Sequence, residues 1–236
     1  MCITLAIIRL ILLFALMAWP LSPATAQTNT TAIQTGQKEA YAILIDNTGS
    51  MRSQFGLVSE LSKRIVEQTH QRGPISLYAF KTQGRMSDAR AIVSSEFGWS
   101  QDKTILENYI DGLFVIGGQT AIRDGITAMA EKLNAKAAAA KEPHAKFIVL
   151  ITDGEDRVSK IGEKELIKTL KDNNIKVYAI GLTSELENQR GLIGKGSADR
   201  AVGFLKKVTK ETGGRAVFPK SKKVDVEVLV NELFAK

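Results

Sequence analysis

Apolar residues are distributed unevenly along this chain of 236 residues, and four stretches are apolar at nearly every position. Strands that are buried on both faces have this composition, because a parallel sheet covered by helices exposes neither face to water. The pattern therefore predicts four inner strands of a parallel sheet. They cover residues 40–46, 75–80, 146–152 and 176–182.

Two weaker patterns complete the expected sheet. Residues 89–95 (ARAIVSS) alternate more between apolar and polar side chains, which is typical of an edge strand. Residues 215–219 (RAVFP) are a short candidate for the last strand, which a proline ends. We therefore expect about six strands, mostly parallel, with one antiparallel edge strand.

Helical periodicity lies between these strands. Apolar residues recur three and four positions apart, as they do on the buried stripe of an amphipathic helix. Alternating strands and helices predict an α/β fold, a doubly wound and mostly parallel central sheet with helices on both faces. The expected helices cover residues 55–70, 120–141, 163–174, 200–214 and 223–236.

The first 26 residues have the layout of a secretory signal peptide. One basic residue, Arg9, precedes an apolar run over residues 10–19, and a proline and the small residues 24–26 follow. The run is shorter than the about 20 residues that a helix needs to cross a bilayer core. We expect a secreted or periplasmic protein, with the signal peptide cleaved after Ala26. A retained membrane anchor is the alternative.

The rest of the chain reads as a polar, flexible N-terminal tail over residues 27–38 and one domain over residues 39–236. The only cysteine, Cys2, lies before the apolar run, so the exported chain can form no disulfide and depends on its core for stability. Removing the signal peptide, whose one charged residue is Arg9, lowers the net charge from +7 to +6. The basic residues are explained either as solvated helix faces or as a surface that attracts an acidic partner or an anionic membrane.

Polar side chains follow two of the predicted inner strands. Asp46 ends the first strand, and Thr48 and Ser50 follow it at alternate positions. Asp153 directly follows a second strand, and Thr120 lies in a glycine-containing loop just before a helix. In such a sheet, ligands bind at the loops that leave the carboxyl ends of the strands. Two carboxylates at this edge would repel each other unless a cation lay between them.

These five side chains offer two carboxylates and three hydroxyls. Hard cations such as Mg²⁺ require oxygen ligands at roughly 2.0–2.1 Å and retain several waters. No histidine or cysteine lies nearby in the sequence, which argues against zinc. The alternative is that each residue is a turn or helix-cap residue, because Asp, Ser and Thr favour both positions.

In order and spacing, Asp46-Asn47-Thr48-Gly49-Ser50, Thr120 and Asp153-Gly154 resemble the metal-ion-dependent adhesion site of von Willebrand factor A (VWA) domains. The resemblance extends over about residues 39–220. The family usually has serine where this chain has Thr48, whose hydroxyl can serve as the same kind of ligand. The resemblance implies that Mg²⁺ or Mn²⁺, or else Ca²⁺, is held by Asp46, Thr48, Ser50, Thr120 and Asp153, directly or through water.

The resemblance also implies a mode of binding. A glutamate or aspartate of a protein partner would complete the coordination of the ion, and a basic surface would favour such a partner. The long polar loop over residues 183–200 follows a strand at the same edge, which makes it a candidate for partner selectivity. The expected contact residues are Asn47, Gln119, Glu155, Asn188 and Arg190.

Other classes of function fit the sequence less well. Haloacid-dehalogenase-type phosphatases need a second acidic residue two positions after the strand-end aspartate, where this chain has Thr48. The segment GLIGKGS lacks the Gly-Lys-Ser of a phosphate-binding loop, and no nucleophile–base pair is apparent, so we expect no enzyme. The few Tyr and Trp residues are not interleaved with basic ones, which disfavours nucleic-acid binding. The alternative function is metal-independent binding of anionic lipid or surface polymer.

Overall fold

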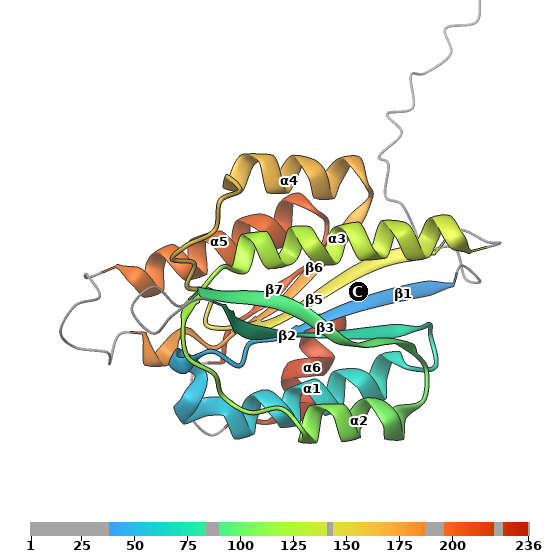
Figure 1. Ribbon diagram of the computed structural model, residues 1–236, viewed down its shortest axis with the longest axis horizontal. Helices are drawn as coiled ribbons and strands as arrows, with labels where there is room; N and C mark the ends of the chain where they lie inside the picture. The colour runs from blue at the N-terminus through green and yellow to red at the C-terminus, as the bar shows by residue number, and fades with distance from the viewer. Residues whose placement is uncertain (1–37, 84–89, 141–143, 187–195, 220–223, 236) are drawn as a thin grey trace, which may run out of the picture. The chain divides into compact units, whose positions relative to one another are not determined.

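The strands form one mixed sheet, as the computed structural model shows (Figure 1). The structure describes residues 38–83, 90–140, 144–186, 196–219 and 224–235, which belong to a compact unit between Thr35 and Lys236. The strands are β1 (Glu39–Ile45), β2 (Ile75–Gln83), β3 (Arg90–Ser100), β4 (Gln119–Thr120), β5 (Ala145–Thr152), β6 (Ile175–Gly181) and β7 (Ala216–Val217). Their order across the sheet is β4-β3-β2-β1-β5-β6-β7.

The four predicted inner strands are confirmed as β1, β2, β5 and β6, which pair in parallel. The expected antiparallel strand is β3, which pairs with β2. Most of β3 forms the border of the sheet, but Arg90 and Ala91 pair in parallel with Gln119 and Thr120 of β4. This two-residue strand adds a seventh member to the sheet, and the sequence did not predict it.

Helices cover both faces of the sheet (Figure 1). One face packs against α3 (Ile122–Ala139), α4 (Glu163–Asp172) and α5 (Ser197–Glu211). The other face packs against α1 (Phe55–Thr69), α2 (Lys103–Asp111) and α6 (Val226–Phe234). Alternate residues of β1 enter the two cores, Leu44 the first and Ile43 the second. Both faces are therefore buried, which explains the unbroken apolar composition of the inner strands.

One helix, α2, was missed by the sequence reading. Its N-cap is Asp102, whose carboxylate accepts a hydrogen bond from the Ile105 N–H at 3.2 Å. Leu106 and Ile110, four residues apart, are buried against the sheet. The cap and this short stripe were the available signals, but nine residues offer only two apolar anchors.

The predicted signal peptide and nearly all of the predicted tail lie outside the described residues. Within the part of the chain that the structure describes, no helix is both long and apolar enough to cross a membrane.

Candidate metal site

The pairing of β1 with β5 brings two aspartates to the same edge of the sheet. Ile45 lies opposite Ile151, and the Asp46 N–H donates to the Ile151 carbonyl at 3.0 Å. Asp46 follows β1 directly, and Asp153 follows β5. Both side chains are buried, because the residues are only 0% and 2% exposed. The expected meeting of two strand-end carboxylates therefore occurs, in a position screened from water.

Three hydroxyls surround this pair of carboxylates. The Thr48 hydroxyl donates to Asp46 Oδ1 at 2.8 Å, and the Thr48 N–H donates to the same oxygen at 3.0 Å. The Ser50 Oγ lies 3.3 Å from the Thr48 Oγ1, and the Thr120 hydroxyl donates to the Thr48 Oγ1 at 3.2 Å. Together with Asp153, these are the five residues predicted as metal ligands, and the structure brings them together.

Burial changes the acidity of both carboxyl groups. Loss of hydration raises the pKa of Asp46, against hydrogen bonds from Thr152 and Thr48 that lower it. Loss of hydration and the neighbouring charge of Asp46 raise the pKa of Asp153 to about 7, against hydrogen bonds from Glu155 and Ser50. No basic side chain among the described residues forms an ion pair with either group. Within the described part of the chain, the pair therefore lacks a counter-charge.

A sixth residue, Thr152, orients Asp46 and was not predicted. Its hydroxyl donates to Asp46 Oδ2 at 2.6 Å and accepts from the Gly154 N–H at 3.0 Å. Both oxygens of Asp46 thus accept hydrogen bonds, and the Thr48 hydroxyl directs its proton to Asp46. One lone pair of that hydroxyl accepts from the Thr120 hydroxyl, and the other could face a cation. The sequence signal was a hydroxyl residue directly before Asp153.

Gly154 allows the β5 edge to approach α5 closely. Its φ is +77°, a left-handed conformation that favours glycine. A Cβ at this position would lie 2.9 Å from Leu205 Cδ1 and 3.2 Å from the Ala201 Cβ. Glycine is therefore favoured after Asp153 both by the backbone conformation of the turn and by the close packing of α5.

The side chain of Asn47 forms hydrogen bonds with β2 and with the loop before β4, so it does not face the open side of the candidate metal site. It is 3% exposed. Its amide NH₂ donates to the carbonyls of Phe114 at 3.0 Å and Phe80 at 3.3 Å, and its Oδ1 accepts from the Phe80 N–H at 2.8 Å. The predicted partner contact by this side chain is not supported by its placement, because burial and these bonds occupy the amide.

Gln119 and Glu155 line an open pocket of about 360 Å³ above the hydroxyl cluster. Gln119 is exposed on β4, whereas Glu155 is half-buried and forms an ion pair with Arg157 at 2.8 Å. The pocket also includes Thr48, Ser50 and Thr120. The other two expected contact residues, Asn188 and Arg190, lie outside the described residues.

The loop after β5 is fastened to the start of α3. Asp156 accepts hydrogen bonds from the Arg123 N–H at 2.9 Å and the Ser159 hydroxyl at 2.5 Å. Asp124 in turn accepts from the Lys160 N–H at 2.9 Å. The loop that carries Asp153 is thus held in place without a ligand, so a cation would bind with little reordering of the chain.

The donor set fits a hard cation better than a soft one. The described residues contain no group of three or more His, Cys, Asp or Glu side chains that could hold a metal ion. Two carboxylates and three hydroxyls offer only oxygen, which Mg²⁺ and Mn²⁺ accept and which structural zinc sites rarely use alone.

Solved structures with the same fold include bacterial membrane and surface proteins. An aerotolerance-related membrane protein from Bacteroides fragilis is 16% identical, with a TM-score of 0.59 over 83% of this chain and 98% of its own. A von Willebrand factor type A protein from Catenulispora acidiphila is 16% identical, with a TM-score of 0.56 over 84% and 41%. The pilus adhesin SpaC from Lactobacillus rhamnosus GG, in an open conformation, is 14% identical, with a TM-score of 0.58 over 85% and 30%.

Sequence comparison identifies the family. Curated protein sequences give no significant match to the chain. The family model of the von Willebrand factor type A domain matches residues 42–216, which include all five predicted ligands and the strands that carry them. The chain therefore belongs to the von Willebrand factor type A family, whose domains are adhesion and binding modules.

Proposed function

We propose that this protein is an exported VWA module that holds a divalent cation and uses it to bind an acidic side chain of a protein partner. The observation that carries the proposal is the pair of buried carboxylates, Asp46 and Asp153, beside three hydroxyls and without an ion-pair partner among the residues that the structure describes. Mg²⁺ or Mn²⁺, or else Ca²⁺, would supply the missing positive charge.

The charges explain why such an ion would remain reactive toward a partner. Asp46 and Asp153 together contribute two negative charges, so a divalent ion makes the centre nearly neutral. Thr48, Ser50 and Thr120 contribute neutral oxygens, and the pocket above them is open. A carboxylate from outside would complete the coordination shell of the ion.

Binding rather than catalysis is the function that we propose for this edge. The two histidines of the chain lie at the opposite edge: His70 caps the end of α1, and His144 precedes β5. The site hydroxyls contact carboxylates and one another rather than a general base. Export rests on the predicted signal peptide over residues 1–26.

Thermal unfolding in chelator, Mg²⁺, Mn²⁺ and Ca²⁺ tests the cation site. An ion at one hundred times its dissociation constant stabilises the folded state by about 2.7 kcal/mol if it binds only that state. We expect this gain in the native protein and its loss in Asp46→Ala. Asp172→Ala is the matched control, because Asp172 is exposed on α4 and forms an ion pair with Lys168. A folded native protein that no ion stabilises would overturn the proposal.

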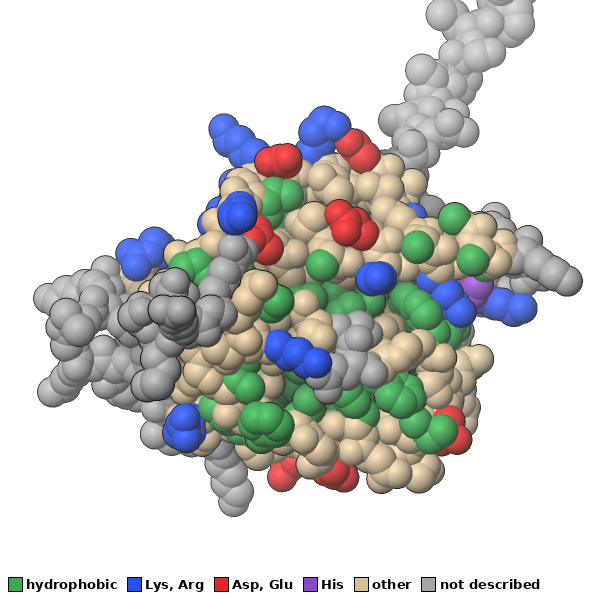
Figure 2. Space-filling view, in the orientation of Figure 1, with side chains coloured by type: hydrophobic (Ala, Val, Ile, Leu, Met, Phe, Trp, Pro, Cys, Tyr) green, Lys and Arg blue, Asp and Glu red, His purple; other side chains and the backbone are tan. Residues whose placement is uncertain are grey.

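Metal-independent binding of anionic lipid or surface polymer is the alternative. Figure 2 shows Lys and Arg side chains interspersed with Asp and Glu on the visible face. Several cations of the described residues form ion pairs, for example Lys171 with Glu211 at 3.1 Å and Lys207 with Glu163 at 2.6 Å. This pairing disfavours a continuous basic surface. Binding to anionic vesicles that persists in chelator and collapses with salt would favour the alternative.

A further inference from the structure

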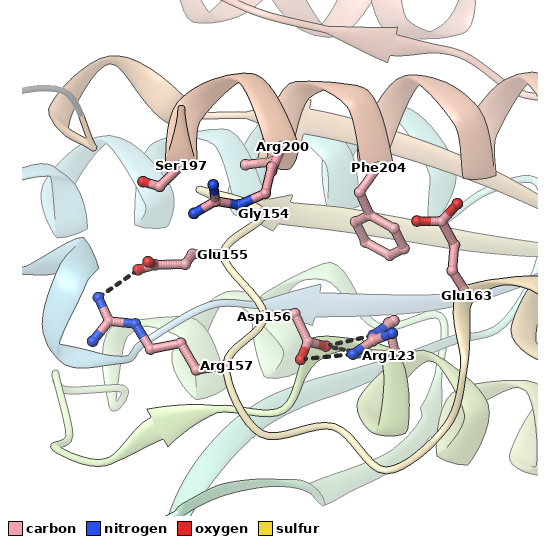
Figure 3. A pocket seen from close by; sticks show the side chains of 10 residues that line it. Arg123, Gly154, Glu155, Asp156, Arg157, Glu163, Ser197, Arg200 and Phe204 are labelled. Carbon is pink, nitrogen blue, oxygen red and sulfur yellow. Dashed lines mark hydrogen bonds and ion pairs between the residues drawn. The ribbon is translucent and has the colours of Figure 1, made fainter. Parts of the chain in front are cut away.

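A second pocket adjoins the candidate metal site. It has a volume of about 340 Å³ and lies between the loop over residues 154–157, the starts of α3 and α4, and one face of α5 (Figure 3). The side chains on that face of α5 are Ser197, Arg200, Ala201 and Phe204, and we call this space the α5 pocket.

The α5 pocket and the metal-site pocket share one wall. Glu155 and Arg157 line both pockets, and the Arg157 Nη2 lies 2.8 Å from the Glu155 Oε2. Figure 3 shows this ion pair on the side of the pocket opposite Phe204. A peptide bound at the metal site would therefore need to cross only one pair of side chains to enter the α5 pocket.

Arg200 is the cation of the α5 pocket that has no ion-pair partner among the described residues. Arg123 pairs with Asp156, as Arg157 does with Glu155. The Glu163 carboxylate is taken by Lys207, at 2.6 Å. No acidic group in the described ranges pairs with Arg200, which points from α5 toward the loop (Figure 3). A guanidinium presents donors in a fork that matches a carboxylate.

Ser197 adds a buried polar group to the same pocket. The residue is 6% exposed, and its hydroxyl has no hydrogen-bond partner among the described residues. It is the first residue of α5, whose N-cap, Gly196, provides no side-chain hydrogen bond. The start of a helix of 15 residues favours negative charge, as Arg200 does. The Ser197 hydroxyl lines the pocket, where it can donate a hydrogen bond to an anion.

The remaining wall is apolar. Phe204 and Ala201 are 9% and 3% exposed, and Gly154 contributes no side chain. The pocket thus combines an anion-binding end with an apolar side, which suits a carboxylate on an aliphatic stem.

We propose that the α5 pocket receives a second acidic side chain of the same partner, with glutamate preferred to aspartate. The inference rests on the proposed function, because the first carboxylate of the partner is the one at the metal. Recognition would then require two acidic residues, one read by the cation and one by Arg200 and Ser197. A partner with a single acidic residue would bind more weakly.

The test uses glycine-rich synthetic peptides with the full protein in saturating Mg²⁺. One peptide carries a single glutamate, and the others carry two glutamates separated by one to four glycines. Titrations followed by NMR measure the dissociation constants, including weak ones. We expect the best two-glutamate peptide to bind about tenfold more tightly than the single-glutamate peptide, as a charged hydrogen bond would provide.

Arg200→Gln should abolish this tenfold advantage while leaving the affinity for the single-glutamate peptide unchanged. Lys210→Gln is the matched control, because it removes the same charge near the other end of α5. Equal thermal stability of the two variants shows that the fold is kept. Ser197→Ala should reduce the advantage without removing it.

Several results would overturn the inference. The first is an affinity gain from the second glutamate that is the same in Arg200→Gln as in Lys210→Gln. The second is the absence of any such gain in the native protein. The third is the absence of saturable binding by every two-glutamate peptide. If Mg²⁺ stabilises the protein in an Asp46-dependent manner and the second glutamate adds nothing, only the α5 pocket assignment fails. If Mg²⁺ gives no stabilisation, the proposed function fails first. Competition by inorganic phosphate alone, equal in Asp46→Ala, would identify a simple anion site instead.

Discussion

The two ends of β1 both carry a buried carboxylate, but the protein treats them in opposite ways. At the amino end, Glu39 is 6% exposed and forms an ion pair with Arg72, whose Nε lies 2.7 Å from Oε2 and whose Nη2 lies 2.8 Å from Oε1. The Tyr41 hydroxyl also donates to Glu39. At the carboxyl end, Asp46 lies beside Asp153 and receives only neutral donors.

The difference is what we expect between a structural carboxylate and one of the proposed cation site. A buried charge is unfavourable unless an opposite charge lies near it. Removing one partner of a buried ion pair typically lowers stability by about 3–5 kcal/mol. Arg72 supplies the opposite charge for Glu39, whereas none of the described residues supplies one for Asp46 and Asp153. Two adjacent buried carboxylates without a nearby cation point to a functional constraint, since buried groups with strongly shifted pKa values concentrate at functional sites.

The largest effect should come from breaking the paired end. Arg72→Met leaves Glu39 buried without a counter-charge, and we expect a loss of about 2–3 kcal/mol, reduced from the fully buried case because Arg72 is partly exposed. Denaturant unfolding in chelator measures it. Adding Glu39→Gln to Arg72→Met should recover most of the loss. The response to Mg²⁺ should not change, and a lost response would show that the two ends are coupled.

The unpaired end should respond with the opposite sign. Asp153→Asn removes one of two adjacent buried charges but keeps an oxygen that can accept from the Glu155 N–H. We expect the protein in chelator to gain about 1–2 kcal/mol, and its stabilisation by Mg²⁺ to disappear. Asp172→Asn on the surface of α4 is the control and should change neither value. A loss of stability in chelator would contradict the comparison.

The same asymmetry should appear in the pH dependence. Because the pKa of Asp153 is raised to about 7, the folded protein without metal binds more protons than the unfolded chain above about pH 4. This group therefore makes stability fall as the pH rises toward 7. Carboxylates whose pKa is lowered, such as Glu67 and Glu211, act in the opposite direction and reduce the net effect.

The measurement is the difference in unfolding free energy between the native protein and Asp153→Asn, taken from pH 4 to pH 8 in chelator. We expect the difference to grow with pH and to shrink when Mg²⁺ is present. A difference that stays constant across this range would show that Asp153 is already ionised at pH 4.

The smallest effect should come from Thr48→Ser, which converts the site to the usual family residue. Thr48 is 1% exposed, so removing its methyl group should cost about 0.5–1 kcal/mol in chelator. The gain from Mg²⁺ should persist because the hydroxyl remains. Thr48→Val keeps the shape, removes the hydroxyl and should lose that gain. Equal Mg²⁺ responses in both variants would exclude this hydroxyl as a ligand.

Sequence patterns located the parts of the molecule that burial determines. The four inner strands were predicted within a few residues because apolar side chains on both faces leave a continuous signal. Two aspartates at strand ends could be placed on one edge, since parallel strands share an edge. β4 could not be found in this way, because two residues have no periodicity and their pairing with β3 depends on the folded sheet.

Side-chain direction was the main information that the sequence lacked. Asn47 lies next to Asp46 and was expected at the surface, but the pleat of the chain turns it inward onto Phe80 and Phe114. Thr152 was read as the end of a strand, although the register of β1 and β5 aims its hydroxyl at Asp46. Neither orientation follows from residue type alone.

The short length of β4 affects the rate at which this edge of the sheet opens. β4, which carries Thr120, pairs with β3 at only two positions, Arg90 with Gln119 and Ala91 with Thr120. The Thr120 carbonyl also accepts a hydrogen bond from the Arg157 N–H at 3.0 Å, whereas Asp46 and Asp153 follow long inner strands. Edge segments with few backbone hydrogen bonds open fastest in hydrogen exchange. We expect the Thr120 amide to exchange sooner than those of β1 and β5, so that opening of this edge sets how long a captured ion, and any partner held through it, stays bound.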